Sequence, residues 1–389
     1  MKQRILLFDT ILDGHHPDYL SYLIGYFSGQ PSIEVYVVSG ESFKTEFDKR
    51  QEEEQRVWGS NIHFLPINSR EIARIHKKSI YLRSFIEWRL MLKYALEVNA
   101  SHAIIMYFDY FQLGAWLGKR AHLPVSGILF RPAIAGTNTG IYASLKSRIL
   151  KKALRAGQIK NLFCLVPTAV PLIQAYTHQV NVRELCDPIR VFQIDEVRIQ
   201  AWKEKLQLPP SKKIYLNFGH LDNRKGIEVF LKACEALDPS ILSEIALWLV
   251  GPIRPDYQQR IDDAISRVPG LQVIRNYGYL PAPEVQMCFQ SADVILAIYQ
   301  EHVGSSSILV RAAMSEKPVL GSDFGTMGQL IAQKELGLAL DASSPEKVKE
   351  GILLFQSSAV AFSKEKSSSF AQENSIQNFG DTIRQGIES

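Results

Sequence analysis

The sequence predicts an α/β protein of two domains, each built on a parallel sheet, and three observations support this fold class. First, 389 residues exceed the usual size of one core and suit two domains of about 190 residues each. Second, short apolar runs alternate with longer stretches of helical periodicity, as they do in parallel sheets with crossover helices. Third, the alternation restarts after Pro209-Pro210, which marks a domain boundary.

The composition is that of a globular protein, with 46% apolar and 22% charged residues. The N-terminal run MKQRILLFD is too short in apolar residues for a secretion signal, and no apolar stretch approaches the roughly 20 residues that span a bilayer. The four widely spaced cysteines fit reduced thiols better than a disulfide framework or a zinc site; they are Cys164, Cys186, Cys234 and Cys288. We expect a cytoplasmic protein, soluble or peripheral on the inner face of the membrane.

Strands are expected wherever the apolar runs recur. In the first half these runs are residues 5–8, 34–40, 102–108, 125–130 and 162–167, and in the second half 213–219, 245–251, 271–278, 292–299 and 317–323. We expect a first domain at 1–187, a linker at 188–212, a second domain at 213–368, and a terminal helix at 369–389 that can return to the first domain. Ligands of such sheets bind at the carboxyl ends of the strands, here facing a central cleft.

Several motifs are missing, and their absence excludes whole classes of function. The chain has neither a G-x-x-x-x-G-K-[ST] loop nor a G-x-G-x-x-G after its first strand, which argues against a nucleotidase or a dehydrogenase. It has no D-x-D, no H-E-x-x-H and no His/Cys cluster. We therefore expect no catalytic metal.

Two strand–loop–helix segments of the second half suit a diphosphate. In one, a strand leads into Gly304, Ser305, Ser306 and Ser307, after which a helix begins; glycine permits close approach, and free N–H groups at a helix start favour phosphate. In the other, Gly219 and His220 end a strand, and Arg224 and Lys225 precede Gly226 and a helix. Each segment also has a plain structural interpretation, as a serine N-cap and as a solvated pair of cations.

The second half resembles the retaining glycosyltransferases of family 4, which have the GT-B fold of two Rossmann-like domains. The similarity covers about residues 213–345. The family's G-R-L…K-G, G-x-L and E-G-F-G…E-A…P-V elements correspond here to Gly219-His220-Leu221…Lys225-Gly226, Gly278-Tyr279-Leu280 and Val303-Gly304-Ser305-Ser306…Arg311-Ala312…Pro318-Val319. The resemblance implies a nucleotide-sugar donor in the second domain, with the base near Tyr279 and Leu280, and an acceptor on the first.

The chain departs from the family at both glutamates of this last element. Val303 occupies the position of the first, which lies near the transferred sugar, and Arg311 that of the second, which binds the ribose. Glu301 and His302 lie close enough in sequence to replace the sugar contacts, and His302 is a catalytic candidate. Arg311 is expected to meet a phosphate or an internal carboxylate.

The first domain offers acceptor-side candidates at three strand ends. Gly14, His15 and His16 follow the first strand, where the resemblance implies a glycine loop that faces both donor phosphate and acceptor. His16 is a candidate proton acceptor. Asp109 is the best carboxylate candidate, with a helix cap as the alternative, and Arg131 follows the next strand.

The first domain also carries the basic charge of the chain. Residues 1–187 hold 23 Lys and Arg against 16 Asp and Glu, although the whole chain carries only +4. Residues 142–157 form a basic amphipathic helix whose apolar stripe is Leu145, Ile149, Ala153 and Ala156. This helix either rests on anionic lipid or packs on its own domain.

We therefore expect a hexosyltransferase that moves a sugar from a UDP- or GDP-linked donor to a glycan, lipid-linked or small-molecule acceptor, with retention and without a further cofactor. No nucleic-acid partner is expected. The alternatives are a non-catalytic binding or scaffold protein of the same fold, and a sugar-nucleotide epimerase or phosphorylase.

Overall fold

The computed structural model describes residues 2–11, 16–54, 58–133, 141–302 and 307–389. They form two compact units, one of residues 1–188 with 376–389 and one of residues 189–375. Each unit is described by itself.

The described residues of the first unit form a seven-stranded, wholly parallel sheet in the order β3-β2-β1-β4-β5-β6-β7. Its strands are β1 (Gln3–Phe8), β2 (Ile33–Gly40), β3 (Ile62–Ile67), β4 (His102–Ile105), β5 (Val125–Leu129), β6 (Ile159–Cys164) and β7 (Asn181–Glu184). The strand order reverses between β1 and β4. At such a switch point the two following loops diverge, which makes its carboxyl edge the usual ligand site.

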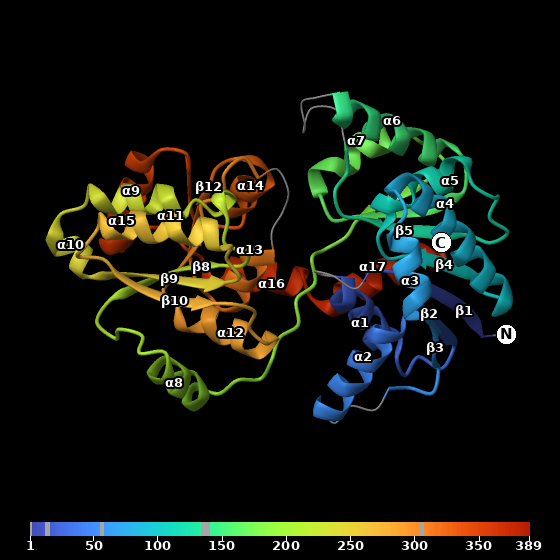
Figure 1. Ribbon diagram of the computed structural model, residues 1–389, viewed down its shortest axis with the longest axis horizontal. Helices are drawn as coiled ribbons and strands as arrows, with labels where there is room; N and C mark the ends of the chain where they lie inside the picture. The colour runs from blue at the N-terminus through green and yellow to red at the C-terminus, as the bar shows by residue number, and fades with distance from the viewer. Residues whose placement is uncertain (1, 12–15, 55–57, 134–140, 303–306) are drawn as a thin grey trace. The chain divides into compact units, whose positions relative to one another are not determined.

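Helices cover both faces of this sheet (Figure 1). They are α1 (His16–Phe27), α2 (Glu41–Glu54), α3 (Ser69–His76), α4 (Ile80–Glu97), α5 (Gln112–Leu117), α6 (Ile141–Arg155), α7 (Val170–Gln174) and α17 (Ile376–Glu388), with 3₁₀ turns at Phe108–Tyr110 and Pro167–Ala169. Leu6 and Phe8 of β1 point into one core with α4, and Ile5 and Leu7 into the other with α1. Because both faces are buried, the strands read as continuous apolar runs.

The second unit repeats this plan in its described residues with six parallel strands in the order β10-β9-β8-β11-β12-β13. These strands are β8 (Lys213–Phe218), β9 (Ile245–Gly251), β10 (Gln272–Tyr277), β11 (Val294–Ala297), β12 (Val319–Ser322) and β13 (Gly337–Leu340). The order reverses between β8 and β11, so this unit has its own switch point.

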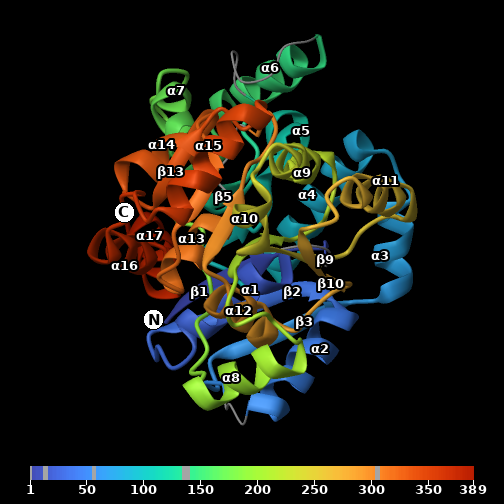
Figure 2. The ribbon, with the colours of Figure 1, turned by 90° about the vertical axis from the view of Figure 1, so that its left-hand side faces the viewer.

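Its helices are α8 (Glu196–Lys205), α9 (Ile227–Glu235), α10 (Pro239–Ser243), α11 (Pro255–Ser266), α12 (Ala282–Ser291), α13 (Ser307–Met314), α14 (Gly325–Gln333), α15 (Pro345–Gln356) and α16 (Lys364–Glu373), with a 3₁₀ turn at Asn223–Lys225. Helices α9, α11 and α15 pack together over one face of the sheet (Figure 2). The core on the other face is lined by α12, α13 and α14.

Three segments differ from the sequence-based expectations. Residues 188–212 contain α8, and Trp202 and Leu208 are buried in the second unit, so this stretch packs as part of that unit. Residues 369–389 are not one helix, because α16 ends at Glu373 in the second unit and α17 belongs to the first. In α6 the buried residues are Ser147, Leu150, Ala153 and Leu154, whereas Leu145 is 47% exposed.

Within the described residues, no helix is both long and apolar enough to span a bilayer.

Candidate functional site

The switch point of the first unit holds an Asp–His pair, of which Asp9 is buried and His16 is mostly buried. Asp9 directly follows β1, and His16 opens α1, with Nδ1 of His16 2.8 Å from Oδ2 of Asp9. The other carboxylate oxygen accepts a hydrogen bond from the backbone N–H of Ile11 at 2.9 Å. Because a carboxylate only accepts, the imidazole must donate through Nδ1, which leaves Nε2 as the nitrogen for exchange with a ligand.

Two aromatic rings fix the plane of this imidazole. The ring of His16 stacks on Tyr107 at a centroid distance of 4.3 Å, and Tyr107 stacks on Phe130 at 4.5 Å. Tyr107 follows β4 and Phe130 follows β5, so residues after three neighbouring strands meet here. Burial, and then the charge of Asp109, raise the pKa of the Tyr107 hydroxyl. That hydroxyl is therefore a donor throughout the physiological range.

Asp109 hydrogen-bonds the backbone at the carboxyl end of β5. Its two carboxylate oxygens accept from the backbone N–H groups of Phe130 at 3.0 Å and Arg131 at 2.9 Å. Burial raises the pKa of the Asp109 carboxyl, and the two N–H groups oppose that shift. The side chain thus fixes the first two residues after β5, and the Arg131 side chain itself lies exposed.

A second buried carboxylate adjoins this pair. Glu87 of α4 accepts from the hydroxyl of Thr10, and Nε of Arg83 donates to it at 2.8 Å. Arg83 also contacts Thr10 at 3.4 Å, and its guanidinium lies 5.6 Å from the ring centroid of Tyr110. Burial raises the pKa of Glu87. This network links α4 to the carboxyl end of β1.

At the switch point of the second unit lies a buried lysine. Lys225, in the turn after β8, donates from Nζ to the carbonyl of Phe218 at 2.6 Å and to the hydroxyl of Tyr299 at 2.5 Å. Tyr299 follows β11, the strand across the switch point. An ammonium has three donors, and the described residues account for two of them.

Glycines at the ends of β8 and β9 allow the two backbones to approach each other closely beside this lysine. Gly219 has φ +112°, and a Cβ there would lie 2.9 Å from Nζ of Lys225. Gly251 has φ +130°, and a Cβ on it would lie 2.0 Å from the carbonyl oxygen of Gly219. Only glycine permits this approach of the β8 and β9 ends.

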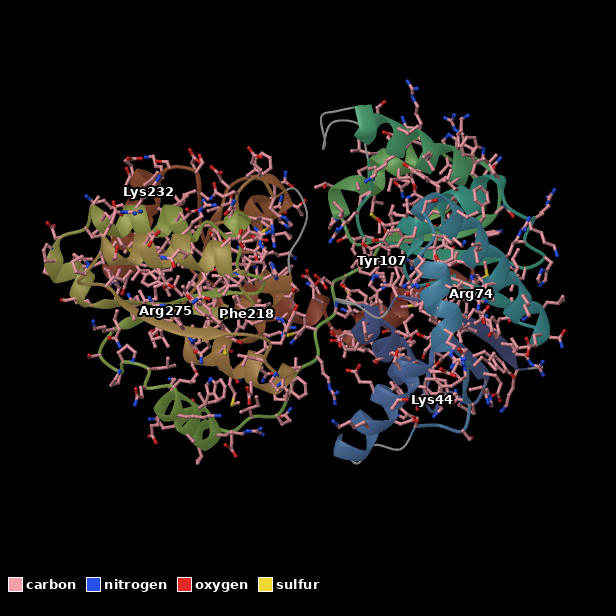
Figure 3. All side chains as sticks on the ribbon, in the orientation of Figure 1. Lys44, Arg74, Tyr107, Phe218, Lys232 and Arg275 are labelled. Carbon is pink, nitrogen blue, oxygen red and sulfur yellow. The ribbon has the colours of Figure 1, made fainter. Side chains whose placement is uncertain are left out.

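Arg224 and His302 complete the cluster around Tyr299. The guanidinium of Arg224 lies 5.0 Å from the ring centroid of Tyr299, and the ring of His302 packs edge-on at 5.3 Å. The backbone carbonyl of Arg224 accepts from the N–H of Gln300 at 2.8 Å. Two cations and a histidine thus surround one buried tyrosine, the arrangement that suits an anionic ligand. Tyr107 and Phe218 mark the two switch points in Figure 3.

Comparison with solved structures shows which fold these two units form. HepE of Anabaena in complex with UDP superimposes with a TM-score of 0.71 at 12% identity, covering 100% of both chains. The chain has the GT-B fold. Sucrose-phosphate synthase of Thermosynechococcus elongatus matches with a TM-score of 0.71 at 12% identity, covering 99% of this chain and 98% of that one.

The N-terminal domain of trehalose-6-phosphate phosphatase of Candida albicans matches this GT-B chain with a TM-score of 0.70 at 13% identity, covering 100% and 97% of the two chains. By sequence, residues 198–374 match the family model described as glycosyl transferases group 1. A search of curated proteins finds no significant match.

The remaining candidate residues of the GT-B chain are spread over both units. Gly14, His15, Val303, Gly304, Ser305 and Ser306 lie outside the described residues. Tyr279 is 88% exposed after β10, while Leu280 packs against the second unit's core. His220 and Glu301 are exposed, Ser307 opens α13, and Arg311 lies in the last turn of that helix.

Sequence reasoning missed Asp9, Tyr107 and Tyr299. Asp9 directly follows the first strand, at the carboxyl edge where ligands of parallel sheets bind, and this position is a signal that the sequence carries. The two tyrosines stand at matching positions, each the second residue after the strand beyond the switch point. This repetition becomes visible only when the strand orders are known.

Proposed function

We propose that this GT-B chain is a glycosyltransferase that uses a nucleoside diphosphate hexose. The observation that carries the proposal is the Arg224–Lys225–Tyr299 cluster at the switch point of a unit that matches a glycosyltransferase family model. UDP-linked donors have support from HepE, whose structures contain UDP and UDP-glucose. GDP-linked donors are the alternative, and the titration described below compares the two nucleotides.

In this proposal the second unit stabilises the leaving nucleoside diphosphate. As the bond between the anomeric carbon and the phosphate oxygen breaks, negative charge grows on the diphosphate. The third N–H of Lys225 and the guanidinium of Arg224 are placed to neutralise that charge. Gly219 permits the phosphate to approach the backbone. The proposal assigns no cofactor beyond the donor itself.

The first unit binds the acceptor in this proposal. Nε2 of His16 accepts the hydrogen bond, or the proton, of the acceptor hydroxyl that forms the new bond to the anomeric carbon. Asp9 orients the ring and stabilises the imidazolium. Retention at the anomeric carbon follows from the family resemblance, and measuring the anomeric configuration of the product tests it.

Helix α6 supports a contact with an anionic surface. Its Leu145, Lys146 and Arg148 are exposed. Two further lysines lie over aromatic rings of the same unit, Lys151 at 3.9 Å from the centroid of Tyr176 and Lys152 at 4.4 Å from that of Trp116. We propose that the helix packs on its own unit through its buried face and presents its basic N-terminal half outward, on the cytoplasmic side of a membrane.

The rival function is a non-catalytic GT-B binding protein. The observation that favours it is the absence of both motif glutamates, since Val303 and Arg311 stand in their places. A coupled assay for nucleotide release separates the two functions, because a binding protein holds the donor without turning it over. An epimerase would convert the donor with no acceptor present.

The deciding experiment is calorimetric titration with UDP and with GDP. We expect one of them to bind the wild type with a Kd of about millimolar or tighter. Lys225→Ala should weaken binding by roughly tenfold or more, because it removes the ammonium that would bind the diphosphate directly. Tyr299→Phe should weaken it by about fivefold, because it removes only the hydroxyl that positions this ammonium. Lys232→Ala, an exposed lysine of the same unit, should bind like the wild type (Figure 3). If neither nucleotide binds the wild type, the donor assignment fails.

A further inference from the structure

A basic and apolar ridge runs along residues 70–82 of the first unit, from α3 into the first turn of α4. Ile80, Tyr81 and Leu82 are three consecutive large apolar side chains that are 49%, 55% and 49% exposed. They stand at the start of α4, directly after its N-cap Ser79.

The helix does not need these three residues for its own packing. Successive helical residues are 100° apart, so three in a row cannot share one core-facing stripe. The face of α4 that packs inward is formed by Ser84, Glu87, Trp88, Met91, Leu92 and Ala95. A run of three exposed apolar residues costs solubility and is retained in proteins mainly for binding.

The charge beside this run is strongly positive. Arg70, Arg74, Lys77 and Lys78 are all exposed, and in the described part of the chain none of them forms an ion pair. Glu71 is the one acidic residue between positions 70 and 82. Arg74 marks α3 in Figure 3. Adjacent cations and exposed apolar side chains, with a tyrosine among them, match the layered chemistry of an anionic lipid surface.

The ridge is joined to the candidate acceptor site by the next residue in the chain. Arg83 follows Leu82 and donates to Glu87 and Thr10, and Thr10 adjoins Asp9. The ridge therefore lies at the carboxyl edge of the first unit's sheet, the edge that holds the Asp9–His16 pair.

We propose that residues 70–82 dock this unit on the surface of an anionic bilayer and that the acceptor is a hydroxyl-bearing amphiphile of that bilayer. The ridge provides the apolar anchor of this docking, to which α6 adds only positive charge, and the docking does not rest on the glycosyltransferase function. The class of acceptor rests in addition on the proposed glycosyltransferase function.

Vesicle flotation of the full chain, without nucleotide, tests the docking. We expect binding to vesicles of phosphatidylcholine mixed with phosphatidylglycerol, weakening as salt rises, and little binding to phosphatidylcholine alone. Replacing Ile80, Tyr81 and Leu82 together by Ser should lower the partition coefficient on the order of a hundredfold. Lys77→Gln and Lys78→Gln should each lower it about fivefold.

The matched control is Leu96→Ser, which changes a 63% exposed leucine at the other end of α4 and should bind like the wild type. The docking proposal is overturned if the wild type does not bind anionic vesicles. It is also overturned if the triple variant binds them as strongly as the wild type, once circular dichroism has shown that the variant is folded. Loss of binding in Leu145→Ser with full binding in the triple variant would transfer the contact to α6.

The acceptor class is tested with radiolabelled hexoses that are linked to the nucleotide, UDP or GDP, that binds in the titration. Wild-type protein is incubated with a lipid extract of the source cells and, separately, with their soluble small-molecule fraction. We expect label in the lipid phase and a loss of most of it in the triple variant. Label only in the soluble fraction overturns the acceptor class. If neither fraction is labelled although the protein still binds vesicles, the glycosyltransferase function is rejected and the docking proposal is retained.

Discussion

At the residue scale, both units place a tyrosine against an ionisable side chain at the switch point. Tyr107 stacks on His16 in the first unit, and Tyr299 accepts from Lys225 in the second. The sequence indicated that His16, Arg224 and Lys225 lie in loops at strand ends, because a strand followed by glycine and a polar loop is a local pattern; their functional roles stay predictions. It was insufficient for their partners, since Asp9 with His16 and Lys225 with Tyr299 meet only through tertiary packing.

The Asp9–His16 pair predicts the behaviour of Asp9→Asn. The amide keeps the shape of the carboxylate but neither stabilises an imidazolium nor enforces donation from Nδ1. We expect kcat to fall on the order of a hundredfold, with KM for the donor unchanged and the pH–rate profile altered. Steady-state kinetics across pH measures both effects.

The double variant Asp9→Asn, His16→Ala serves as the control for this pair. If the two residues act as a unit, the double variant should be no slower than His16→Ala alone. Full additivity of the two losses, or a pH–rate profile that Asp9→Asn leaves unmoved, would show that Asp9 acts only in holding the fold.

At the scale of elements, the long apolar strands were predictable and the short polar ones were not. The run IALWLVG is buried at every position of β9, as expected of a central strand. In contrast, β7 has the sequence NVRE and β3 contains Pro66, so neither presents a continuous apolar run, and β13 is only partly buried along its length. The apolar stripe expected for α6 was correct at Ala153 and wrong at Leu145, because α6 packs with α5 in the core through Leu150, Ala153 and Leu154.

His102 of β4, which hydrogen-bonds Ser126 of β5, predicts that the free energy of unfolding depends on pH. This buried histidine hydrogen-bonds the hydroxyl of Ser126 at 2.7 Å, and burial, assisted by the charge of Lys160, lowers its pKa to about 4. The unfolded chain binds this proton near pH 6.5, so stability is fully present above that pH and falls as pH drops toward 4. The loss amounts to about 3 kcal/mol.

Urea unfolding of the wild type and of His102→Asn between pH 4 and pH 8 measures this contribution. The variant should be less stable at pH 8, and the difference between the two proteins should shrink as the pH falls through the window below 6.5. A difference that stays constant with pH would mean that His102 is protonated equally in both states.

At the scale of the whole molecule, the chain leaves the second unit at Ser375 and completes the first with its last helix. Phe379, Ile383 and Ile387 of α17 are buried in the core that α1 shares. Gly380 makes this close packing possible, because a Cβ there would lie 2.1 Å from the ring of Tyr26. The hydroxyl of Tyr26 in turn donates to Asp381 at 2.5 Å. The C-terminal segment is thus part of the first unit's core.

This connection predicts that damage to α17 destabilises the first unit and spares the second. Phe379→Ala should cost about 3–5 kcal/mol by removing a fully buried ring. Hydrogen–deuterium exchange should then rise in β1, β2, β4 and β6, while β8, β9 and β11 keep their protection, because each sheet has its own cores. Gln385→Ala, on the exposed face of the same helix, should leave both patterns unchanged. If protection instead fell equally in both sheets, the two units would unfold as one cooperative body. The units that meet at Pro188 and Ser375 would then not be independently stable.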